Sequence, residues 1–492
     1  MEIFPRSAAF LAKAAAVRFF TVYGVNTVLF ILTQQSTLFM NQMINLNHRL
    51  ASLDREIKVG IVGIGSIGKG LVFQSHHTRG IQPVAIADIH IKKAVDCAEW
   101  LKLDYEVVDS VAELNRVIGK GKVAVTDNGE LIASTESIDV LIESSNAVYQ
   151  GAIHAIKAIR SHQHVVMMNY EAEMMYGPYL LDLARQEGVV YTCADGDQPT
   201  VIKKLIDDIT LWGFDLVMAG NIKGFHDRYT NPTKIAPEAD KRLLDHKMCS
   251  SYTDGTKLCV EMAVLANGIN GMTAIPGMYG HRIPHIQDIF KYYDFEKLWN
   301  GKNPLVDYVV GAYPKGGVFV IGHTHEKFQQ WTMEWFPPEM GPGPFYVFYR
   351  PFHLGHIEAM ECVAQAFLFG TARLQPAYGM RTNVFTYAKK DLKAGEVLDG
   401  MGGYNSYGFI ENLADQQTPG LPILLNDNLK LKRDVRMDEC ITLNDVDFDP
   451  SDPAFRLYFE ALRFGRPVDD VVEPDLAFKR PETDKSRVKE TM

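Results

Sequence analysis

The chain has 492 residues, of which 47% are hydrophobic and 22% are charged, a composition typical of a folded globular enzyme. This length predicts two or three compact domains rather than one. The formal net charge is -10 and no long basic run occurs, so we expect no nucleic-acid partner. The six cysteines are scattered without a C-x-x-C pair. This spacing predicts reduced thiols in a cytoplasmic protein rather than a zinc site or a disulfide framework.

The first 42 residues form an N-terminal extension that stands apart from the rest. Their apolar run, 19–32, is interrupted by polar residues and is shorter than the roughly 20 residues that a membrane-spanning helix needs, so we expect no membrane segment. The extension resembles a targeting segment. The alternative, which we favour, is that translation begins at Met40 or Met43.

A glycine-rich turn follows the first buried strand. The apolar run 59–62 breaks at Gly63, Gly65 and Gly68, the G-x-G-x-x-G spacing of a dinucleotide-binding βαβ unit. Gly63 permits the tight turn, Gly65 lets the backbone approach a pyrophosphate, and Gly68 lets the helix pack closely against the strand. The phosphates would be bound by amides at the helix N-terminus, where the helix dipole favours negative charge.

Other strand ends supply further candidates for the cofactor site. The second strand ends at Asp88, at about the distance along the chain where an acidic residue binds the adenosine ribose. The segments 138–145 and 164–168 are also predicted strands, and polar residues stand at their ends. The predicted cofactor-binding residues are Gly63, Gly65, Ser66, Ile67, Gly68, Asp88, Ser144, Ser145 and Asn169.

The order of predicted elements defines an α/β protein of several domains. Strands and helices alternate over residues 43–195, which predicts a Rossmann domain with a doubly wound parallel sheet; a small hairpin is expected at 122–129. Residues 196–383 predict a central α+β catalytic and oligomerisation domain. Residues 384–449 predict a mainly β module, and 450–492 a C-terminal segment with a frayed tail. Within the central domain, a helix is expected at 256–267, and apolar residues at helical spacing over 258–269 predict that it faces the core.

Several motifs in order resemble one known family. The glycine-loop segment resembles homoserine dehydrogenases, and residues 389–445 are similar to the SAF module of sialic-acid synthases and antifreeze-like proteins. Together with the linking motifs, the resemblance covers about 43–449 and is to the deoxyxylulose-phosphate reductoisomerase-like oxidoreductases. These linking motifs are 194–199, 220–225, 254–257 and 349–353.

This resemblance implies an NAD(P)-dependent oxidoreductase that forms a homo-oligomer. Its sharpest version is the conversion of 1-deoxyxylulose 5-phosphate to methylerythritol 4-phosphate, an isoprenoid precursor, with a divalent Mg or Mn cation. Tyr170 stands where homoserine dehydrogenases carry a lysine, which argues against homoserine as substrate. The carboxylate metal motif of ordinary reductoisomerases is not recognisable. Asp88 would repel the 2′-phosphate of NADP, whereas His90, Lys92 and Lys93 could offset it, so NAD and NADP both stay open.

Reduction of a carbonyl needs a proton donor near the oxygen and groups that orient the substrate. Lys257 follows Asp254, which is suited to cap the helix that carries the lysine. The alternative for Lys257 is a surface pair with Glu261, four residues along the helix. The predicted catalytic residues are Lys257, Lys223, Asp254, Lys241 and Arg242, the last two as cations for a substrate phosphate.

Other polar residues favour structural interpretations. Asp195 and Asp197 suit a turn, although they could also bind substrate hydroxyls or a cation. His323 and His325 would share one side of a strand, but no fourth ligand stands at a telling spacing. We therefore predict that these histidines line a polar cleft or cap strand ends, and we predict no protein-held metal site.

Three functions stay open at this point. The first is an NAD(P)-linked oxidoreductase of a small, hydroxylated, anionic carbonyl compound, with the reductoisomerase reaction as its sharpest form. The second is a plain dehydrogenase of a sugar acid or an amino-acid precursor. The third is a cofactor- or carbohydrate-binding protein without turnover.

Overall fold

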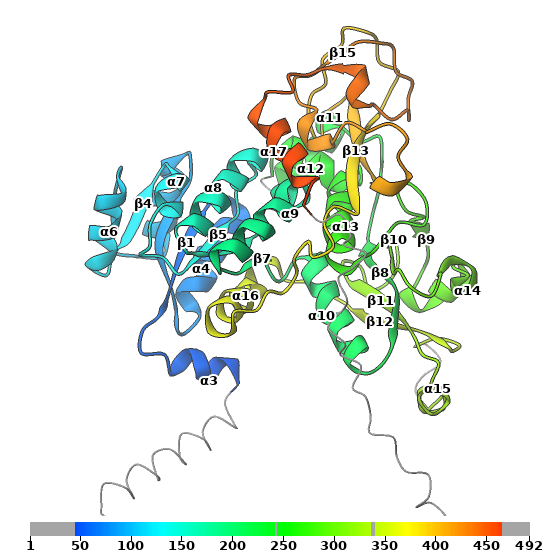
Figure 1. Cartoon of the computed structure of the whole chain (residues 1–492), viewed down its shortest axis with the longest axis horizontal. Coiled ribbons are helices and arrows are strands. Elements are labelled where there is room, and N and C mark those ends of the chain that lie inside the picture. Colours follow the sequence, from blue (N-terminus) through cyan, green and yellow to red (C-terminus); the bar gives the residue numbers. More distant parts are fainter. Residues whose placement is uncertain (1–44, 242–243, 336–339, 465–492) are drawn as a thin grey trace, which may run out of the picture. The chain divides into compact units, whose positions relative to one another are not determined.

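The computed structural model describes residues 45–241, 244–335 and 340–464 (Figure 1). The predicted extension 1–42 and the tail from 465 lie outside the described residues. Residues 45–56 and 79–81 belong to a small unit that contains helix α3 (Leu46–Ala51), and the rest of the described chain forms a second compact unit. Within the described residues, no helix combines the length and the apolar character needed to cross a bilayer.

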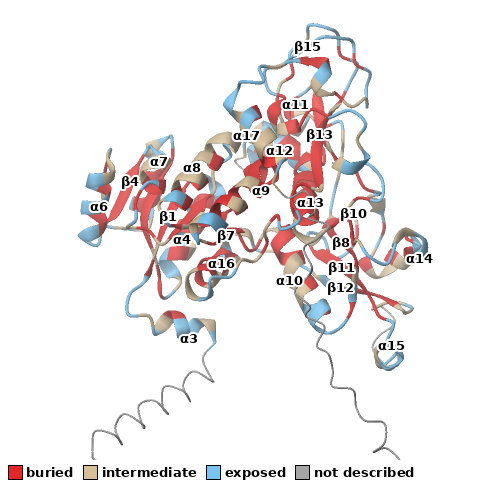
Figure 2. Ribbon diagram, in the orientation of Figure 1, coloured by how far each residue is buried: buried red, intermediate tan, exposed pale blue. Residues whose placement is uncertain are grey.

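A seven-stranded parallel sheet carries the glycine loop, as predicted. Its strand order is β3-β4-β2-β1-β5-β6-β7, so the chain starts in the middle and winds outward in both directions. The strands are almost continuous apolar runs, because helices cover both faces of such a sheet (Figure 2). Its strands are β1 (Ile57–Val62), β2 (Ile81–Ala87), β3 (Tyr105–Val107), β4 (Val123–Thr126), β5 (Val140–Glu143), β6 (His164–Met167) and β7 (Tyr191–Cys193).

The predicted hairpin at 122–129 is wrong. Residues 123–126 form β4, which pairs in parallel with both β2 and β3 inside the main sheet. Asn128, which we took for a turn former, caps a short helix instead, since its side chain accepts a hydrogen bond from the backbone N–H of Glu130. A run of four buried residues is too short to distinguish a parallel strand from one arm of a hairpin.

Six helices connect the strands of this sheet. Helix α9 begins at Tyr170, directly after the end of β6, and it contains Pro178. Asn169 is its N-cap, with Oδ1 accepting from the backbone N–H of Ala172. The connecting helices are α4 (Ser66–His77), α5 (Ile91–Trp100), α6 (Val111–Gly119), α7 (Gly129–Ala133), α8 (Val148–Arg160) and α9 (Tyr170–Glu187).

A second, mixed sheet of five strands follows, in the order β12-β11-β8-β10-β9. Strand β10 pairs with β8 and β9 in parallel, whereas β11 pairs antiparallel with both β8 and β12. Together with the helices around it, this mixed sheet forms the predicted α+β arrangement. The strands are β8 (Asp215–Lys223), β9 (His281–Arg282), β10 (Leu305–Val310), β11 (Val318–His323) and β12 (Phe345–Arg350).

Helix α13 (Thr256–Ile269) is buried on every side over its first three turns (Figure 2). The sequence predicts a single core-facing stripe, but all residues from 256 to 267 are buried. A helix of this kind lies in the interior, so any charged residue on it needs partners. The other elements around the second sheet are α10 (Gln198–Leu211), α11 (Pro232–Lys241), α12 (His246–Thr253), η1 (Ile286–Lys291), α14 (Phe295–Leu298), α15 (Lys327–Met333) and α16 (Gly355–Phe369).

The last part of the described chain is mainly β, as predicted, and it packs on α13. Strands β13 (Thr382–Ala388) and β14 (Ser406–Asn412) form an antiparallel pair in register. The Gly408 N–H donates to Thr256 Oγ1 over 2.7 Å, which joins β14 to the first residue of α13. The remaining elements are η3 (Leu413–Asp415), η4 (Ile423–Leu425), β15 (Lys430–Leu431), η5 (Leu443–Asp445), β16 (Val446–Asp447) and α17 (Pro453–Ala461).

Replacement of Gly408 by alanine tests this contact. A Cβ there would lie 2.7 Å from side-chain atoms of both Thr256 and Val384, so β14 must shift away from α13. We expect the free energy of unfolding to fall by about 1–3 kcal/mol in urea titrations, the usual cost of overpacking. Gly119→Ala is the control, because a Cβ at that position meets nothing within 4 Å. Equal stability of the two variants would contradict the contact.

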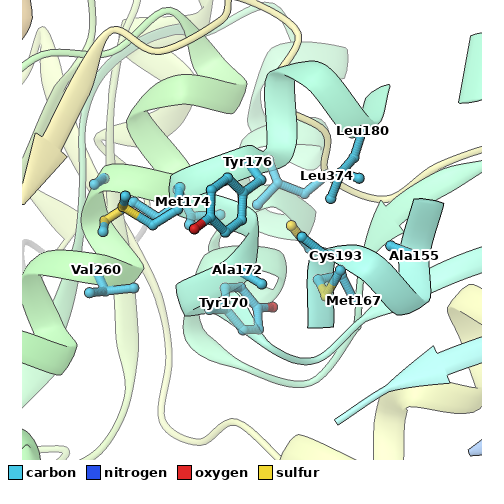
Figure 3. Close-up of a cluster of buried hydrophobic side chains, with 14 of the residues drawn as sticks. Ala155, Met167, Tyr170, Ala172, Met174, Tyr176, Leu180, Cys193, Val260 and Leu374 are labelled. Carbon is cyan, nitrogen blue, oxygen red and sulfur yellow. The ribbon is translucent and has the colours of Figure 1, made fainter. Parts of the chain in front are cut away.

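One hydrophobic core joins the first sheet to α9 and α13 (Figure 3). Met167, Met174 and Met175 are buried in it. Val260 of α13 belongs to the same cluster as Ala172 of α9. This packing fixes the start of α13 against the start of α9, where the candidate site lies.

Candidate active site

The glycine loop has the conformation that a dinucleotide site needs. Gly63 has φ +92°, a region that L side chains rarely adopt, and a Cβ on Gly68 would lie 1.8 Å from the Gly63 carbonyl oxygen. A Cβ on Gly65 would meet nothing within 4 Å. The first and third glycines are thus required by the fold, whereas the second borders open space.

The amides behind Gly65 are available to a ligand. Gly65 is the N-cap of α4, and no side chain of the described residues forms a capping hydrogen bond at this helix end, where Ser66 and Ile67 begin the helix. Uncapped N–H groups and the helix dipole together favour an anion. The open space over Gly65 and the free helix end fit the pyrophosphate of a dinucleotide.

Asp88 lies at the carboxyl end of β2, as predicted, but its carboxylate also has a structural task. Oδ2 accepts from the backbone N–H of Ile64 over 2.9 Å, and Oδ1 accepts from that of His90 over 2.9 Å. Lys93 approaches the same group, with Nζ 3.9 Å from Oδ1. Each carboxylate oxygen has a second lone pair, so Asp88 can hold the glycine loop in place and still accept a ribose hydroxyl.

Ser144, Ser145 and Asn169 follow the next two strand ends. Ser144 Oγ donates to the carbonyls of Val62 and Gly63, over 2.9 Å each, which fixes the end of β1. Ser145 donates through both its N–H and its hydroxyl to the buried carboxylate of Glu143. Because the carboxyl ends of parallel strands share one edge of a sheet, these residues lie along the same edge as the glycine loop.

Lys257 enters this edge from the second domain. Its Nζ lies 2.6 Å from Oε1 of Glu171, the second residue of α9, which starts just beyond β6. The two side chains are only 11% and 8% exposed. Burial acts to lower the pKa of Lys257, but the carboxylates of Glu171 and Glu261 outweigh it and raise the pKa above its ordinary value. Lys257 is therefore a fixed cation, which rules out the predicted alternative of a surface pair.

Glu261 lies one turn beyond Lys257 on α13 and is also buried. Burial raises the pKa of Glu261 to about 8, with a further increase from Asp197, while Lys223 and Lys257 act in the opposite direction. Asn221 Nδ2 donates to Glu261 Oε2 over 3.5 Å. A carboxyl with a pKa near the ambient pH can exchange a proton with a substrate. The site therefore combines a fixed cation with a proton-exchanging carboxyl.

Lys223 belongs to the same neighbourhood, as predicted. It ends β8 and is half-buried, and its charge acts on Glu261. Asp197, which we predicted as a turn former, caps α10 through the N–H of Gln198 and also raises the pKa of Lys257. Four charged side chains from three elements therefore converge near the sheet edge.

Asp254 contacts the start of α13 and Lys389 rather than the side chain of Lys257. Its Oδ1 accepts from the backbone N–H of Thr256 over 2.9 Å at the start of α13, as predicted. Its Oδ2 lies 2.8 Å from Nζ of Lys389, a buried lysine that also donates to the carbonyls of Thr230 and Gly403. Since these contacts occupy its carboxylate, Asp254 joins the mainly β module to the catalytic helix.

The remaining predicted charges comprise an exposed lysine, a buried aspartate and an arginine that the structure does not describe. Lys241 is exposed at the end of α11, and Arg242 lies outside the described residues. Asp195 is buried in an ion-pair cluster, 2.7 Å from Lys204 Nζ and 3.4 Å from Arg373 Nε. Asp195 therefore has cationic partners and acts as a structural residue.

Glu171 and Glu261 are the site residues that sequence reasoning missed. Glu171 directly follows Tyr170, so its place after a strand end was visible, but its partner is 86 residues away. Glu261 was visible only as the i+4 neighbour of Lys257. A signal existed in the helix composition, since 256–269 contains two charged residues among apolar ones.

A Rossmann sheet with an open glycine loop, and a second domain that adds a lysine and carboxyls at its edge, defines a two-domain oxidoreductase. Residues 196–359 match the family model described as oxidoreductase DRL, catalytic domain. The match includes Lys223, Lys257 and Glu261. The central part of the chain therefore resembles the catalytic domain of the DRL oxidoreductases.

One curated protein also matches part of the chain. The homoserine dehydrogenase of Bacillus subtilis (strain 168) is 28% identical over 136 residues, which is 27% of this chain. The chain spans only about a quarter (28%) of the length of that curated relative.

Two solved structures match parts of the chain at low sequence identity. The reductoisomerase of 1-deoxy-D-xylulose 5-phosphate from Zymomonas mobilis, in complex with NADPH, is 14% identical with a TM-score of 0.33 and covers 66% of this chain and 84% of its own. A probable dehydrogenase from Thermotoga maritima is 10% identical with a TM-score of 0.37 and covers 64% and 90%, respectively.

Proposed function

We propose that the chain is an NAD(P)-dependent oxidoreductase that reduces the carbonyl group of a small, hydroxylated, anionic compound. The observation that carries this proposal is the buried contact between Lys257 and Glu171, at the edge of the sheet that also bears the glycine loop. Lys257 and Glu261 of α13 are buried together with Glu171 of α9, and charged groups with strongly shifted pKa values gather at functional sites.

Each residue of the site has a task in this proposal. The nicotinamide ring supplies the hydride when the cofactor is bound. Lys257 donates a hydrogen bond to the carbonyl oxygen and stabilises the negative charge that develops there. Glu261, with its pKa raised to about 8, gives the proton to that oxygen. Lys223 binds an acidic group of the substrate.

The sharpest form of the proposal is the reductoisomerase reaction on 1-deoxyxylulose 5-phosphate, with Mg²⁺ or Mn²⁺. Such a cation prefers oxygen ligands, of which Glu171 and Glu261 supply two carboxyls near Lys257; no third metal-ligating side chain joins them among the described residues. The test is to mix the purified chain with this substrate, either nicotinamide cofactor and either cation, and to follow nicotinamide absorbance. If neither NADPH nor NADH is oxidised, this form of the proposal is excluded. The substrate of the oxidoreductase must then be sought in a wider screen of carbonyl compounds.

The second candidate is a plain dehydrogenase of the homoserine type, which the Bacillus subtilis relative favours. One observation in the structure disfavours homoserine itself. Tyr170, which replaces the family's lysine, is fully buried and donates to the Ala194 carbonyl over 2.8 Å, so it cannot reach a substrate. Activity on a sugar acid without a divalent cation would favour the plain dehydrogenase.

Replacement of Gly65 by alanine tests the cofactor site apart from the substrate. Gly65 has φ -75° and open space beside it, so alanine is tolerated by the fold but fills the place of the pyrophosphate. We expect the dissociation constant for NADH and NADPH, measured by calorimetry, to rise at least about tenfold, with stability changed by less than about 0.5 kcal/mol. Gly119→Ala is the control. Unchanged binding by the Gly65 variant would place the nucleotide elsewhere and remove the main support for the oxidoreductase proposal.

A further inference from the structure

Two histidines and an aspartate meet at the end of the second sheet that lies away from Lys223. Asp215 is the first residue of β8 and His323 is the last residue of β11, and the two are direct partners in the antiparallel ladder. His325 follows two residues later. One ligand atom from each of these three side chains lies within 4.8 Å of the others.

A β-bulge creates this arrangement. The register between β11 and β8 shifts between Ile321 and Gly322, so that Gly322 faces Leu216 and His323 faces Asp215. Without the shift, His323 would face the leucine. Bulges recur where a strand must re-aim a side chain. Here the bulge places an imidazole opposite a carboxylate.

The ring of His323 is buried but unsatisfied. Its side chain is 7% exposed, and it is enclosed by the rings of Trp299 and Phe345, with centroids at 5.3 and 4.9 Å. Its Nδ1 has no hydrogen-bond partner among the described residues, and Oδ2 of Asp215, at 3.6 Å, is too distant for one. A buried polar atom without a partner destabilises the fold, so it calls for a ligand.

We propose that Asp215, His323 and His325 bind one zinc ion. Two imidazoles and one carboxylate are a donor set for zinc and its neighbours in the transition series, whereas magnesium and calcium prefer oxygen ligands alone. Asp215 and His325 are exposed, so water can complete a tetrahedral shell. The ion would satisfy Nδ1 of His323.

This zinc site has a structural task and is separate from the oxidoreductase site. Asp215 and Lys223 stand at opposite ends of β8, eight residues apart, which corresponds to about 26 Å along an extended strand. The ion is therefore far from the substrate of the proposed reaction. It joins the beginning of β8 to the segment that follows β11.

The test uses the full chain, loaded with zinc sulfate, passed through a desalting column and analysed by inductively coupled plasma mass spectrometry. We expect about one zinc ion per chain, and a rise in the melting temperature when zinc is added, since a ligand of the native state stabilises it. Asp215→Asn and His325→Ala each remove one exposed ligand, and we expect zinc affinity to fall at least about tenfold in both. Magnesium in place of zinc should not bind.

The control is His246→Ala. His246 and Asp240 form an exposed histidine–aspartate pair at 2.7 Å that does not belong to the cluster, so its loss should leave the zinc content unchanged. The proposal is overturned if the wild-type chain retains no zinc, if both cluster variants retain as much as the wild type, or if the control loses as much as they do. The melting temperature decides the same question, because only a real site gives a zinc-dependent rise that both cluster variants lack.

Discussion

Lys257→Met is expected to lower kcat by about 10²- to 10³-fold on the substrate that the chain reduces, with nicotinamide binding unchanged. The reason is that Lys257 is the fixed cation beside the proposed carbonyl oxygen, and loss of one such donor has a cost of this size. Steady-state kinetics with both cofactors, together with calorimetric cofactor binding, measure the effect. A variant with full kcat would show that this lysine does not contact the reacting oxygen.

The same substitution has an effect on stability that needs no substrate. It leaves Glu171 buried without its partner, and breaking a buried ion pair in this way costs about 3–5 kcal/mol. Urea unfolding at pH 7 measures this loss. The double variant with Glu171→Gln should recover much of it, because the unpaired charge is then also removed.

A surface pair provides the matched control. Lys92 and Asp96 also lie 2.6 Å apart, but their side chains are 82% and 53% exposed. Lys92→Met should cost less than about 0.5 kcal/mol, since exposed pairs contribute little. The two pairs share a distance and differ in burial. Equal costs for Lys257→Met and Lys92→Met would mean that the Lys257 pair is solvated in solution.

Much of the fold could be predicted from local pattern. The glycine spacing around 63–68 and the apolar runs of β1 and β2 predict a βαβ unit. This prediction succeeds because a tight turn and a buried strand are each encoded by residues that lie close together in the sequence. The start of α13 was also predicted to the residue, since Asp254, which precedes the N-cap Gly255 and accepts from the N–H of Thr256, is a local signal. Pairing is not local, which is why β4 was taken for one arm of a hairpin.

Individual residues of the candidate site were predicted, but the contacts between them were not. Lys257 and Lys223 could be named because each stands near the boundary of an element. Their partners could not, because the separation of 86 residues between Lys257 and Glu171 is closed by the packing of α9 on α13. The zinc cluster shows the same limit. His323 and His325 were visible as a pair, but the aspartate opposite them is set by strand register and a bulge.

Glu261→Gln is expected to remove a large part of the decrease in stability with pH. Its carboxyl has a pKa of about 8 in the folded chain against an ordinary value of 4.5, so the folded state binds the proton more tightly than the unfolded state. The free energy of unfolding therefore falls as pH rises from about 4.5 to 8, by about 1.4 kcal/mol per unit. Between pH 6 and 8 this amounts to about 2 kcal/mol, which the variant should not lose.

Comparison of the two proteins in urea at several pH values isolates this carboxyl. Burial also raises the pKa of Glu173 to about 7, and that residue contributes a similar slope, but it is present in both proteins and cancels in the difference. Glu136→Gln, at an exposed position, removes the same charge and should leave the wild-type curve unchanged. Below about pH 4.5 Glu261 is neutral in both the folded and the unfolded chain, so wild type and variant should be about equally stable there and diverge progressively as the pH rises toward 8. A constant difference at all pH values would mean that Glu261 is ionised throughout, and it would then be a permanent partner of Lys257 rather than the proton donor.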